Sequence, residues 1–445
     1  MQSASSIGSR VLGLVSLVIT MAIPAFSQDN SPWSRYGLGD INPSSNIVSR
    51  GMGHTAAAYS DFQTINFVNP ASYSRFGAQR SILDLGLDIN SRTLRNTAGE
   101  RYTSNNAYIP YLAAGFQLKG EKQKREWGLA FGLRPVTKVS YNIVSGGRIT
   151  AGDSTITNYV GEGGTYQAFA GTAVAFKKLS VGVNFGYRFG SKDYNTNVYI
   201  LNDTATDRYV AGRKMIKNSF GGAFLELGLQ YLITINKKST LQLGAYGSMQ
   251  GKLKNSRDEL LETFVDANGL GNLVRVDSVS DIKNIKGTID YPSYYGFGFL
   301  YDREGKGRLN ISMDYVTHKW SQYRYYGGKD LLQDAWQLNI GSQYLPDVTG
   351  KKGNFWNNVL YRAGFHYGIE PYAFAGNMNS FGITLGAGIP IRKYTYAEVN
   401  KNNLVNVALE FGQRGKREQT LRENYFRFTV GFSLSDIWFI KRKYD

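Results

Sequence analysis

The chain has 445 residues with 51 glycines, 10 prolines and no cysteine, and its formal net charge is +17 at pH 7. The lack of cysteine excludes a disulfide scaffold and any site that needs a thiolate. A basic excess of this size can indicate nucleic-acid binding. Here the lysines gather at short turns and in a C-terminal tail, so we expect no nucleic-acid partner.

Residues 1–27 have the features of a secretory signal peptide. Arg10 is the only charge in this stretch, and the apolar run VLGLVSLVITMAIPA follows it. Ala25 and Ser27 stand at the −3 and −1 positions of a cleavage site after Ser27. A buried N-terminal helix is the alternative. We therefore expect an exported protein.

Residues 28–78 are turn-rich and do not fit a strand. The stretch NFVNPASYS, from Asn66 to Ser74, is small and polar. Its proline cannot donate to a strand ladder, which makes a central strand unfavourable. We expect this part of the chain to lie outside any sheet.

Residues 79–435 repeat one pattern, in which apolar and polar or small residues alternate. In YFRFTVGFSLS, Phe426, Phe428 and Val430 alternate with Arg427 and Thr429. About 14 segments of this kind follow one another, and after residue 27 no stretch approaches the roughly 18 apolar residues of a spanning helix. An even number of strands with one apolar face predicts an all-β fold, a transmembrane antiparallel β-barrel, over a soluble sandwich.

The connections are expected to alternate between long and short. Long loops are expected at 145–164, 191–218 and 251–284, and short turns at places such as Lys177 and Lys178. This asymmetry is typical of outer-membrane barrels, with long loops outside the cell and short turns in the periplasm. The basic tail of residues 436–445, with Lys441, Arg442 and Lys443, is then periplasmic. It is either a docking surface for an acidic partner or a set of solvated charges.

The segment before the first strand resembles the N-terminal region of the FadL/TodX family of outer-membrane transporters. The stretch is RGMGHTAAAYSDFQTINFVNPAS, with the motif Asn69, Pro70 and Ala71. In that family the segment folds into a hatch that plugs a 14-stranded barrel. The resemblance implies a hatch within residues 28–78, a barrel at 79–435 and a lumen lined by the small residues of the strands.

The C-terminal part is similar to a narrower branch of FadL-like barrels that includes PorV of the type 9 secretion system. The similar stretches are YRAGFHYG, FGITLGAGIPIR, VNVALEFGQRG and ENYFRFTVGFSLSDIWFIKRKYD. This resemblance implies a barrel that works as part of a larger complex.

The third predicted strand is interrupted at Arg134 and Pro135. In the FadL family a kink in the third strand opens a lateral hole for hydrophobic substrate, so a kink or lateral opening is expected here. The alternative is that the strand ends at Pro135 and a loop begins.

Catalytic chemistry is not expected. The three histidines, His54, His318 and His366, lack metal-ligand spacing, and no nucleophile elbow or Walker loop is present. Carboxylates such as Glu226, Asp314 and Glu410 are expected on lumen faces. We expect no enzyme activity, no cofactor and no metal.

Two functions remain open at the level of sequence. The first is a subunit or binding module of an outer-membrane complex for secretion or barrel assembly, with outer-membrane or periplasmic proteins as partners. The alternative is a FadL-like channel that takes up small hydrophobic compounds and releases them through the barrel wall. Both place the chain in the bacterial outer membrane, among its lipids and lipopolysaccharide.

Overall fold

The computed structural model describes residues 30–77, 80–118, 126–148, 154–201, 210–266, 273–348, 355–373, 376–391, 403–416 and 421–437. Their elements are η1 (Pro32–Arg35), β1 (Asp40–Ile41), α2 (Ile47–Gly51), η2 (Pro70–Arg75), β2 (Arg80–Asn96), β3 (Arg101–Tyr108), β4 (Leu112–Gln117), β5 (Glu126–Arg148), β6 (Ser154–Phe176), β7 (Leu179–Leu201), β8 (Ala211–Asn236), β9 (Ser239–Ser248), β10 (Gly251–Asp266), β11 (Leu273–Tyr291), β12 (Tyr294–Glu304), β13 (Arg308–His318), η3 (Trp320–Gln322), β14 (Arg324–Tyr325), β15 (Ala335–Leu345), η4 (Phe355–Asn358), β16 (Leu360–Ile369), β17 (Asn379–Ile391), β18 (Asn403–Arg414) and β19 (Leu421–Ile437). None of the helices in these ranges is long and apolar enough to cross a membrane.

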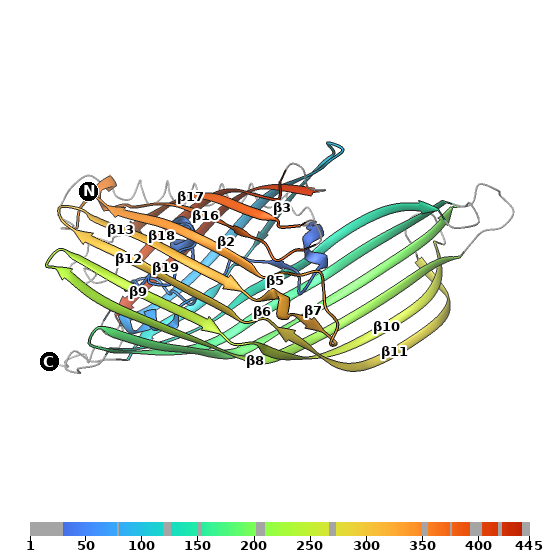
Figure 1. Cartoon of the computed structure of the whole chain (residues 1–445), viewed down its shortest axis with the longest axis horizontal. Helices are drawn as coiled ribbons and strands as arrows, with labels where there is room; N and C mark the ends of the chain where they lie inside the picture. The colour runs from blue at the N-terminus through green and yellow to red at the C-terminus, as the bar shows by residue number, and fades with distance from the viewer. Residues whose placement is uncertain are drawn as a thin grey trace, which may run out of the picture.

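The strands form one closed antiparallel barrel (Figure 1). The last strand, β19, pairs with the first long strand, β2, from Leu421 opposite Asn96 to Ile437 opposite Arg80. Three wall strands are each interrupted and consist of two pieces, namely β3 with β4, β9 with β10, and β11 with β12. β1 and β14 are two-residue additions to the sheet. The wall therefore has 14 strands. The predicted fold class is confirmed.

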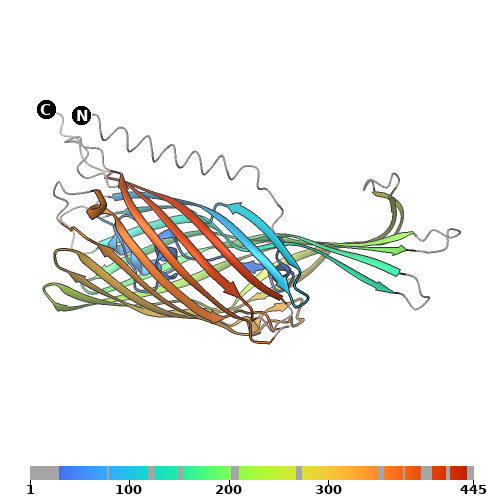
Figure 2. The same cartoon turned by 90° about the horizontal axis from the view of Figure 1, so that it is seen from above.

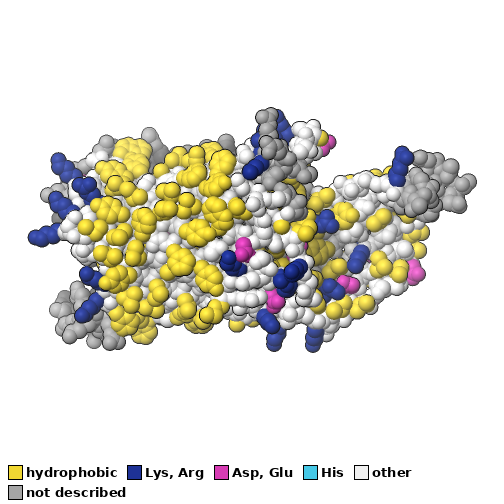
Figure 3. All heavy atoms as spheres, viewed as in Figure 1, with side chains coloured by type: hydrophobic (Ala, Val, Ile, Leu, Met, Phe, Trp, Pro, Cys, Tyr) yellow, Lys and Arg dark blue, Asp and Glu magenta, His cyan; other side chains and the backbone are white. Residues whose placement is uncertain are grey.

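Side chains alternate between the two faces of the wall as the sequence pattern predicts. On β8, Leu225, Leu227 and Leu229 are exposed on the outside, while Glu226 between the first two and Gln230 after the last are buried. Figure 3 shows the resulting belt of hydrophobic side chains on one face of the barrel, with lysines and arginines on both sides of it. An apolar belt around a polar interior suits a barrel surrounded by lipid.

Several strands are much longer than a membrane requires. β8 has 26 residues and β16 has 10, whereas a tilted strand crosses a bilayer in roughly 9–11 residues. The outer parts of β5, β6, β7, β8, β10 and β11 continue as one sheet beyond the other strands (Figures 1 and 2). We call this extension the protruding sheet.

The expectation of long loops at 145–164, 191–218 and 251–284 is wrong for most of these residues. β5 runs to Arg148 and β6 starts at Ser154, and 251–284 is mainly the β10–β11 hairpin. These segments lie outside the apolar belt, so their strands do not need a lipid-facing apolar side. The alternation that identifies the other strands is therefore absent from them.

Residues 30–76, here called the inner segment, lie within the barrel. η2 contacts β5, β6, β7 and β8, whereas α2 contacts β16, β17, β18 and β19 on another part of the ring. Met52, Ile65 and Tyr73 are among its fully buried side chains. Apart from β1, which pairs with β5, the segment has no sheet structure, and this is tolerated because it is surrounded by protein rather than lipid. The domain boundaries set out above remain predictions.

Candidate functional site: the inner segment and the protruding sheet

The motif Asn69, Pro70 and Ala71 begins the short helix η2 inside the barrel. The Asn69 side chain accepts a hydrogen bond from the Ala71 backbone N–H at 3.1 Å, and Pro70 occupies the first turn. Both are common ways to start a helix, because the first N–H groups have no partner within it. The same Asn69 amide donates to the backbone carbonyls of Ala57, Leu229 and Ala245 at 2.6, 3.2 and 3.3 Å. One side chain thus connects two parts of the inner segment to the wall.

Glycines on the inner face of the wall allow this close approach. A Cβ added at Gly182 of β7 would collide with the backbone of Pro70 and Ala71, and one at Gly228 of β8 would collide with Asn69. The expectation that glycines inside the strands make room for the inner segment therefore has a concrete structural basis at these two positions.

A buried ion pair connects α2 to the first strand. Arg50 of α2 is 2% exposed, and its guanidinium donates to the carboxylate of Asp88 on β2, which is fully buried. The remaining Arg50 donors reach the carbonyls of Ser45 and Pro43, each at 3.1 Å. A buried charge needs such compensation because its desolvation is costly.

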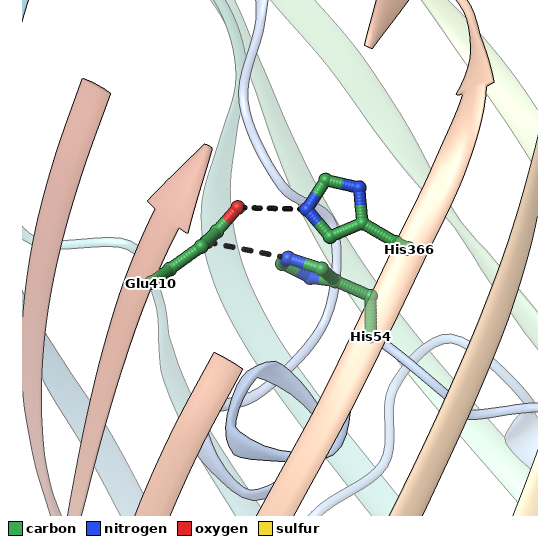
Figure 4. A group of neighbouring side chains, drawn as sticks. All are labelled: His54, His366 and Glu410. Atoms are coloured by element: carbon green, nitrogen blue, oxygen red, sulfur yellow. Dashed lines mark hydrogen bonds and ion pairs between the residues drawn. The ribbon is translucent and has the colours of Figure 1, made fainter. Parts of the chain in front are cut away.

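The histidines of the inner segment and the wall meet at one carboxylate (Figure 4). His54 Nε2 lies 3.3 Å from Glu410 Oε2, and His366 Nε2 lies 3.1 Å from Glu410 Oε1. His54 belongs to the inner segment, His366 to β16 and Glu410 to β18. Burial lowers the pKa of His54 to about 4, an effect that outweighs the opposing influence of Glu410. His54 is therefore neutral near pH 7, and its Nδ1 lies 2.9 Å from the Ser45 hydroxyl.

Within the described ranges, His54, His366 and Glu410 are the group whose side chains have the arrangement to hold a metal ion, with ligand atoms within 4.8 Å of one another. Glu410, however, also accepts hydrogen bonds from Tyr425 at 3.0 Å and from Arg427 at 2.7 Å. Its carboxylate oxygens already have four polar neighbours, one of them a cation. We therefore interpret the cluster as a hydrogen-bonded link between the inner segment and the wall. The expectation of no metal remains a prediction.

Asp40 of β1 forms a second link, near the base of the protruding sheet. Arg92 donates to Asp40 at 2.9 Å and Arg414 donates at 2.8 Å, so two wall strands converge on one carboxylate. Burial alone would raise the pKa of Asp40, but the Arg414 and Arg92 guanidinium groups outweigh it and hold the pKa below its ordinary value. The ion pairs therefore keep Asp40 charged.

A cavity of about 190 Å³ remains between the inner segment and the wall. Charged and amide side chains line part of it, among them Arg134, Gln167, Arg188 and Glu410, and aromatic and aliphatic side chains line the rest, among them Val68, Tyr246, Tyr291, Val316 and Trp320. The lining is therefore mixed, with both apolar and charged groups. A second cavity, of about 530 Å³, opens on the outer surface beside β8 and β9, and its lining includes Leu225, Leu227, Met249, Tyr295 and Phe297.

Arg134 and Pro135 lie within β5, which continues to Arg148. The pairing with β6 shows a register shift between Pro135 and Thr137, which is a local irregularity of the ladder. Arg134 points into the barrel, where it donates to the Ser44 carbonyl at 2.8 Å and pairs with Glu226 at 3.7 Å. A lateral opening at this place stays a prediction. Lys441, Arg442 and Lys443 lie outside the described residues.

Sequence reasoning placed Glu226, Asp314 and Glu410 on the inner face, and all three are buried. It missed Arg50, Asp88 and the residues around Asp40 as links between the inner segment and the wall. A polar residue at an inward strand position signals a buried polar partner. The identity of that partner depends on how the inner segment crosses the lumen, which strand alternation does not reveal.

Comparison with known proteins gives one family and one fold. A family model with the description BamG matches residues 10–445. No curated protein matches the chain. Nothing here supports the narrower resemblance to PorV, because the matching family carries a different name.

Several solved structures share the fold. CymD, a monoaromatic hydrocarbon channel, is 17% identical with a TM-score of 0.53, over 90% of this chain and 99% of that chain. The toluene transporter TbuX of Ralstonia pickettii is 18% identical with a TM-score of 0.53, over 87% and 97%. The toluene transporter TodX of P. putida is 16% identical with a TM-score of 0.53, over 89% and 99%. The resemblance to FadL/TodX barrels is thus confirmed as a likeness of fold. The expectation of no enzyme activity stays a prediction.

Proposed function

The chain belongs to the BamG family, and from that premise we propose that it is a subunit of an outer-membrane complex that assembles β-barrel proteins. The family name points to barrel assembly rather than to secretion. The observation that carries the proposal is the occupied interior of the barrel, where the inner segment is attached to the wall at many separate places. A secretion role, which the similarity to PorV implies, has no comparable support.

The interior contacts favour a fixed structure over a transport path. Arg50 with Asp88, Asp40 with Arg92 and Arg414, and Glu410 with its two histidines attach the inner segment to different strands. Asp314 also accepts the backbone N–H groups of Ala56 and Ala57, at 2.5 and 2.7 Å. Breaking one buried pair costs about 3–5 kcal/mol. Displacing the whole segment to open a channel would break all of these contacts together.

The outside of the molecule is consistent with a membrane-embedded subunit. The apolar belt suits outer-membrane lipid, with lipopolysaccharide as the expected neighbour at the outer leaflet. The protruding sheet extends beyond this belt, where it can reach other proteins (Figure 3). Such an extension is of no use to the membrane span itself, so it supports a role in protein contacts.

A second candidate function is a channel for small hydrophobic compounds. It is favoured by the likeness to CymD, TbuX and TodX and by the apolar cavity beside β8 and β9. The charged side chains in the lining of the inner cavity, Arg134, Arg188 and Glu410, disfavour it, because a hydrocarbon beside them would replace their water without a compensating hydrogen bond.

The test begins with gentle detergent extraction of the tagged protein from its native outer membrane. Co-purifying proteins and small molecules are identified by mass spectrometry after size exclusion. In parallel, the protein is depleted in cells, and the amounts of other folded outer-membrane barrels and the uptake of toluene are measured.

An assembly subunit is expected to co-purify with other proteins in fixed proportion, and its depletion lowers the amount of folded barrels. A barrel that purifies alone with an apolar ligand, together with lower toluene uptake and unchanged barrel levels, would overturn the proposal in favour of the channel. The Arg50→Met variant sharpens the comparison, because a channel with a displaceable segment should gain uptake when that link is weakened.

A further inference from the structure

The cavity of about 530 Å³ on the outer surface is a groove that follows β9. Ala245 and Gly247 of β9 are small, and they lie between larger side chains of the two neighbouring strands. The register places Ala245 between Leu229 and Phe297, and Gly247 between Leu227 and Tyr295. Directly opposite residues share a face of the sheet. The small residues are therefore the floor of this groove, here called the outer groove, and the leucines and aromatic rings are its walls.

The ladder beside the outer groove is interrupted at the end that faces the protruding sheet. β8 pairs with β9 as far as Glu226 opposite Ser248, and pairing with β10 resumes at Gly221 opposite Lys254. Residues 249–253 thus lie opposite 222–225, one residue more on the β9–β10 side, which is a β-bulge. Met249 in this bulge is 78% exposed. The groove therefore ends at a place where the wall is widened.

Beyond the bulge, β10 directs lysines outward. Leu253 and Asn255 are buried, and the exposed Lys252 and Lys254 alternate with them. Lys254 lies opposite Gly221, which is four residues from Leu225 on β8. Positions four apart on a regular strand point the same way, and β8 pairs with β7 without a register shift here. The two lysines are therefore on the same face of the wall as the outer groove.

Lys286 of β11 joins these two lysines on that face. It is exposed and lies opposite Ser256, so it is a diagonal neighbour of Lys254. The β10–β11 register is regular from Gly251 opposite Tyr291 to Arg257 opposite Ile285, so the three side chains share a face. We call Lys252, Lys254 and Lys286 the lysine group. Figure 3 shows lysines and arginines where the apolar belt ends and the protruding sheet begins.

The carboxylates nearby leave this group with an excess of positive charge. Asp290 lies opposite Lys252 on one side and Arg324 of β14 on the other, so two cations share it. Asp258 lies opposite Lys217, which offsets its charge. A cluster of cations at the border of an apolar membrane surface is suited to an anionic lipid head group.

The groove and the lysine group lie toward the outer leaflet. β6 and β7 are joined by the two residues Lys177 and Lys178, at the end of these strands away from the protruding sheet. Short turns are periplasmic in outer-membrane barrels. The protruding sheet is therefore at the opposite, outer end of the wall.

We propose that the outer groove and the lysine group together hold one phosphorylated lipid of the outer leaflet, lipopolysaccharide. An acyl chain lies in the groove, and a phosphate of the head group lies at the lysines. Gly247 and Lys252 belong to one continuous wall strand that advances roughly 3.3 Å per residue, so a single lipid can reach both. A small hydrocarbon would fill the groove but has no use for the lysines. The proposal goes beyond barrel assembly and holds for an assembly subunit and a channel alike.

The test measures lipid binding to the full-length protein by native mass spectrometry in detergent. The delipidated protein is titrated with lipid A that carries two phosphates, and in parallel with phosphatidylethanolamine and with toluene. One lipid A is expected to bind about tenfold or more tightly than phosphatidylethanolamine, which has similar chains but no net negative charge.

The lysine group is tested with K252Q/K254Q/K286Q. This variant is expected to bind lipid A about tenfold or more weakly, with unchanged binding of phosphatidylethanolamine and an unchanged unfolding temperature. K177Q/K237Q/K238Q removes the same charge from exposed positions in the short turns. It is the matched control and is expected to bind lipid A as the wild type does.

The groove is tested with Ala245→Phe, which fills its floor without changing the charge. Lipid A binding is expected to fall several-fold. Ala387→Phe is the control, because Ala387 shares the outward face of β17 with the exposed Leu385 and lies outside the groove lining.

Three results would overturn the proposal. Equal binding of lipid A and phosphatidylethanolamine would mean that the groove is an unselective apolar surface. Equal losses in the two triple-glutamine variants would mean that overall charge, and no local site, attracts the lipid. Toluene that displaces lipid A from the wild type but not from Ala387→Phe would place lipid A outside the outer groove.

Discussion

The interior of the barrel and the protruding sheet use charged residues in opposite ways. Inside, Arg50 and Asp88 are at most 2% exposed and bond to each other and to the backbone. In the protruding sheet, Lys283 and Asp281 are 71% and 41% exposed, with 3.5 Å between their charged atoms. The first pair has lost its water and depends on its partner, whereas the second remains solvated. Stability is therefore concentrated where the inner segment meets the wall.

The largest effect is expected for Arg50→Met. This change leaves the buried Asp88 carboxylate without its closest cation, and we expect the free energy of unfolding in detergent micelles to fall by about 3–5 kcal/mol. Urea unfolding followed by circular dichroism measures it. Lys283→Met is the matched control and is expected to change the value by less than about 1 kcal/mol. Equal effects of the two variants would contradict the distinction between the regions.

A smaller loss is expected for Asn69→Ala. The variant removes the donors to the carbonyls of Ala57, Leu229 and Ala245 and the cap of η2. Buried groups left without a partner cost about 1–3 kcal/mol, measured by the same urea unfolding. Asn96→Ala, at the end of β2, should stay within about 0.5 kcal/mol. A neutral Asn69→Ala would mean that this motif does not hold the inner segment.

Acidification is expected to weaken the interior through Asp40. Its pKa is lowered in the folded protein, so the stabilisation is fully present above the unfolded pKa of about 3.9 and is lost as the pH falls through the folded pKa. Between pH 5 and pH 2 the wild type should lose up to about 1.4 kcal/mol per pH unit more than Asp40→Asn. Parallel stability curves for the two proteins would show that Asp40 makes no such contribution.

The subtlest difference is expected in backbone dynamics. Amide hydrogens of the outer part of β11 should exchange roughly tenfold faster or more than those of β6, which is paired on both sides along its whole length. Hydrogen–deuterium exchange with mass spectrometry on the purified protein measures this. Slower amide exchange at β11 in the intact complex than in the isolated protein would show that the complex protects this edge. Equal exchange rates for β11 and β6 in the isolated protein would contradict the prediction.

Prediction from sequence worked best where lipid imposes a rule. Leu225, Leu227 and Leu229 must face outward if Glu226 faces inward, so the barrel and the inward carboxylates could be inferred from alternation alone. This alternation is not required of strand residues that lie beyond the membrane. Residues 251–284 were expected to be a loop, yet they form most of a hairpin, because pairing with β8 replaces lipid contact as the reason to be a strand.

The sequence by itself determined that this chain is an all-β barrel with one apolar side and a non-strand segment before its first strand, because strand periodicity and bilayer thickness act on neighbouring residues. Only the tertiary structure decided which groups meet inside and which edge stays open. His54 and His366 are 312 positions apart, and they share Glu410 only because the inner segment crosses the lumen beside β16 and β18. Contacts of that kind depend on the path of the chain in space, which no local pattern encodes.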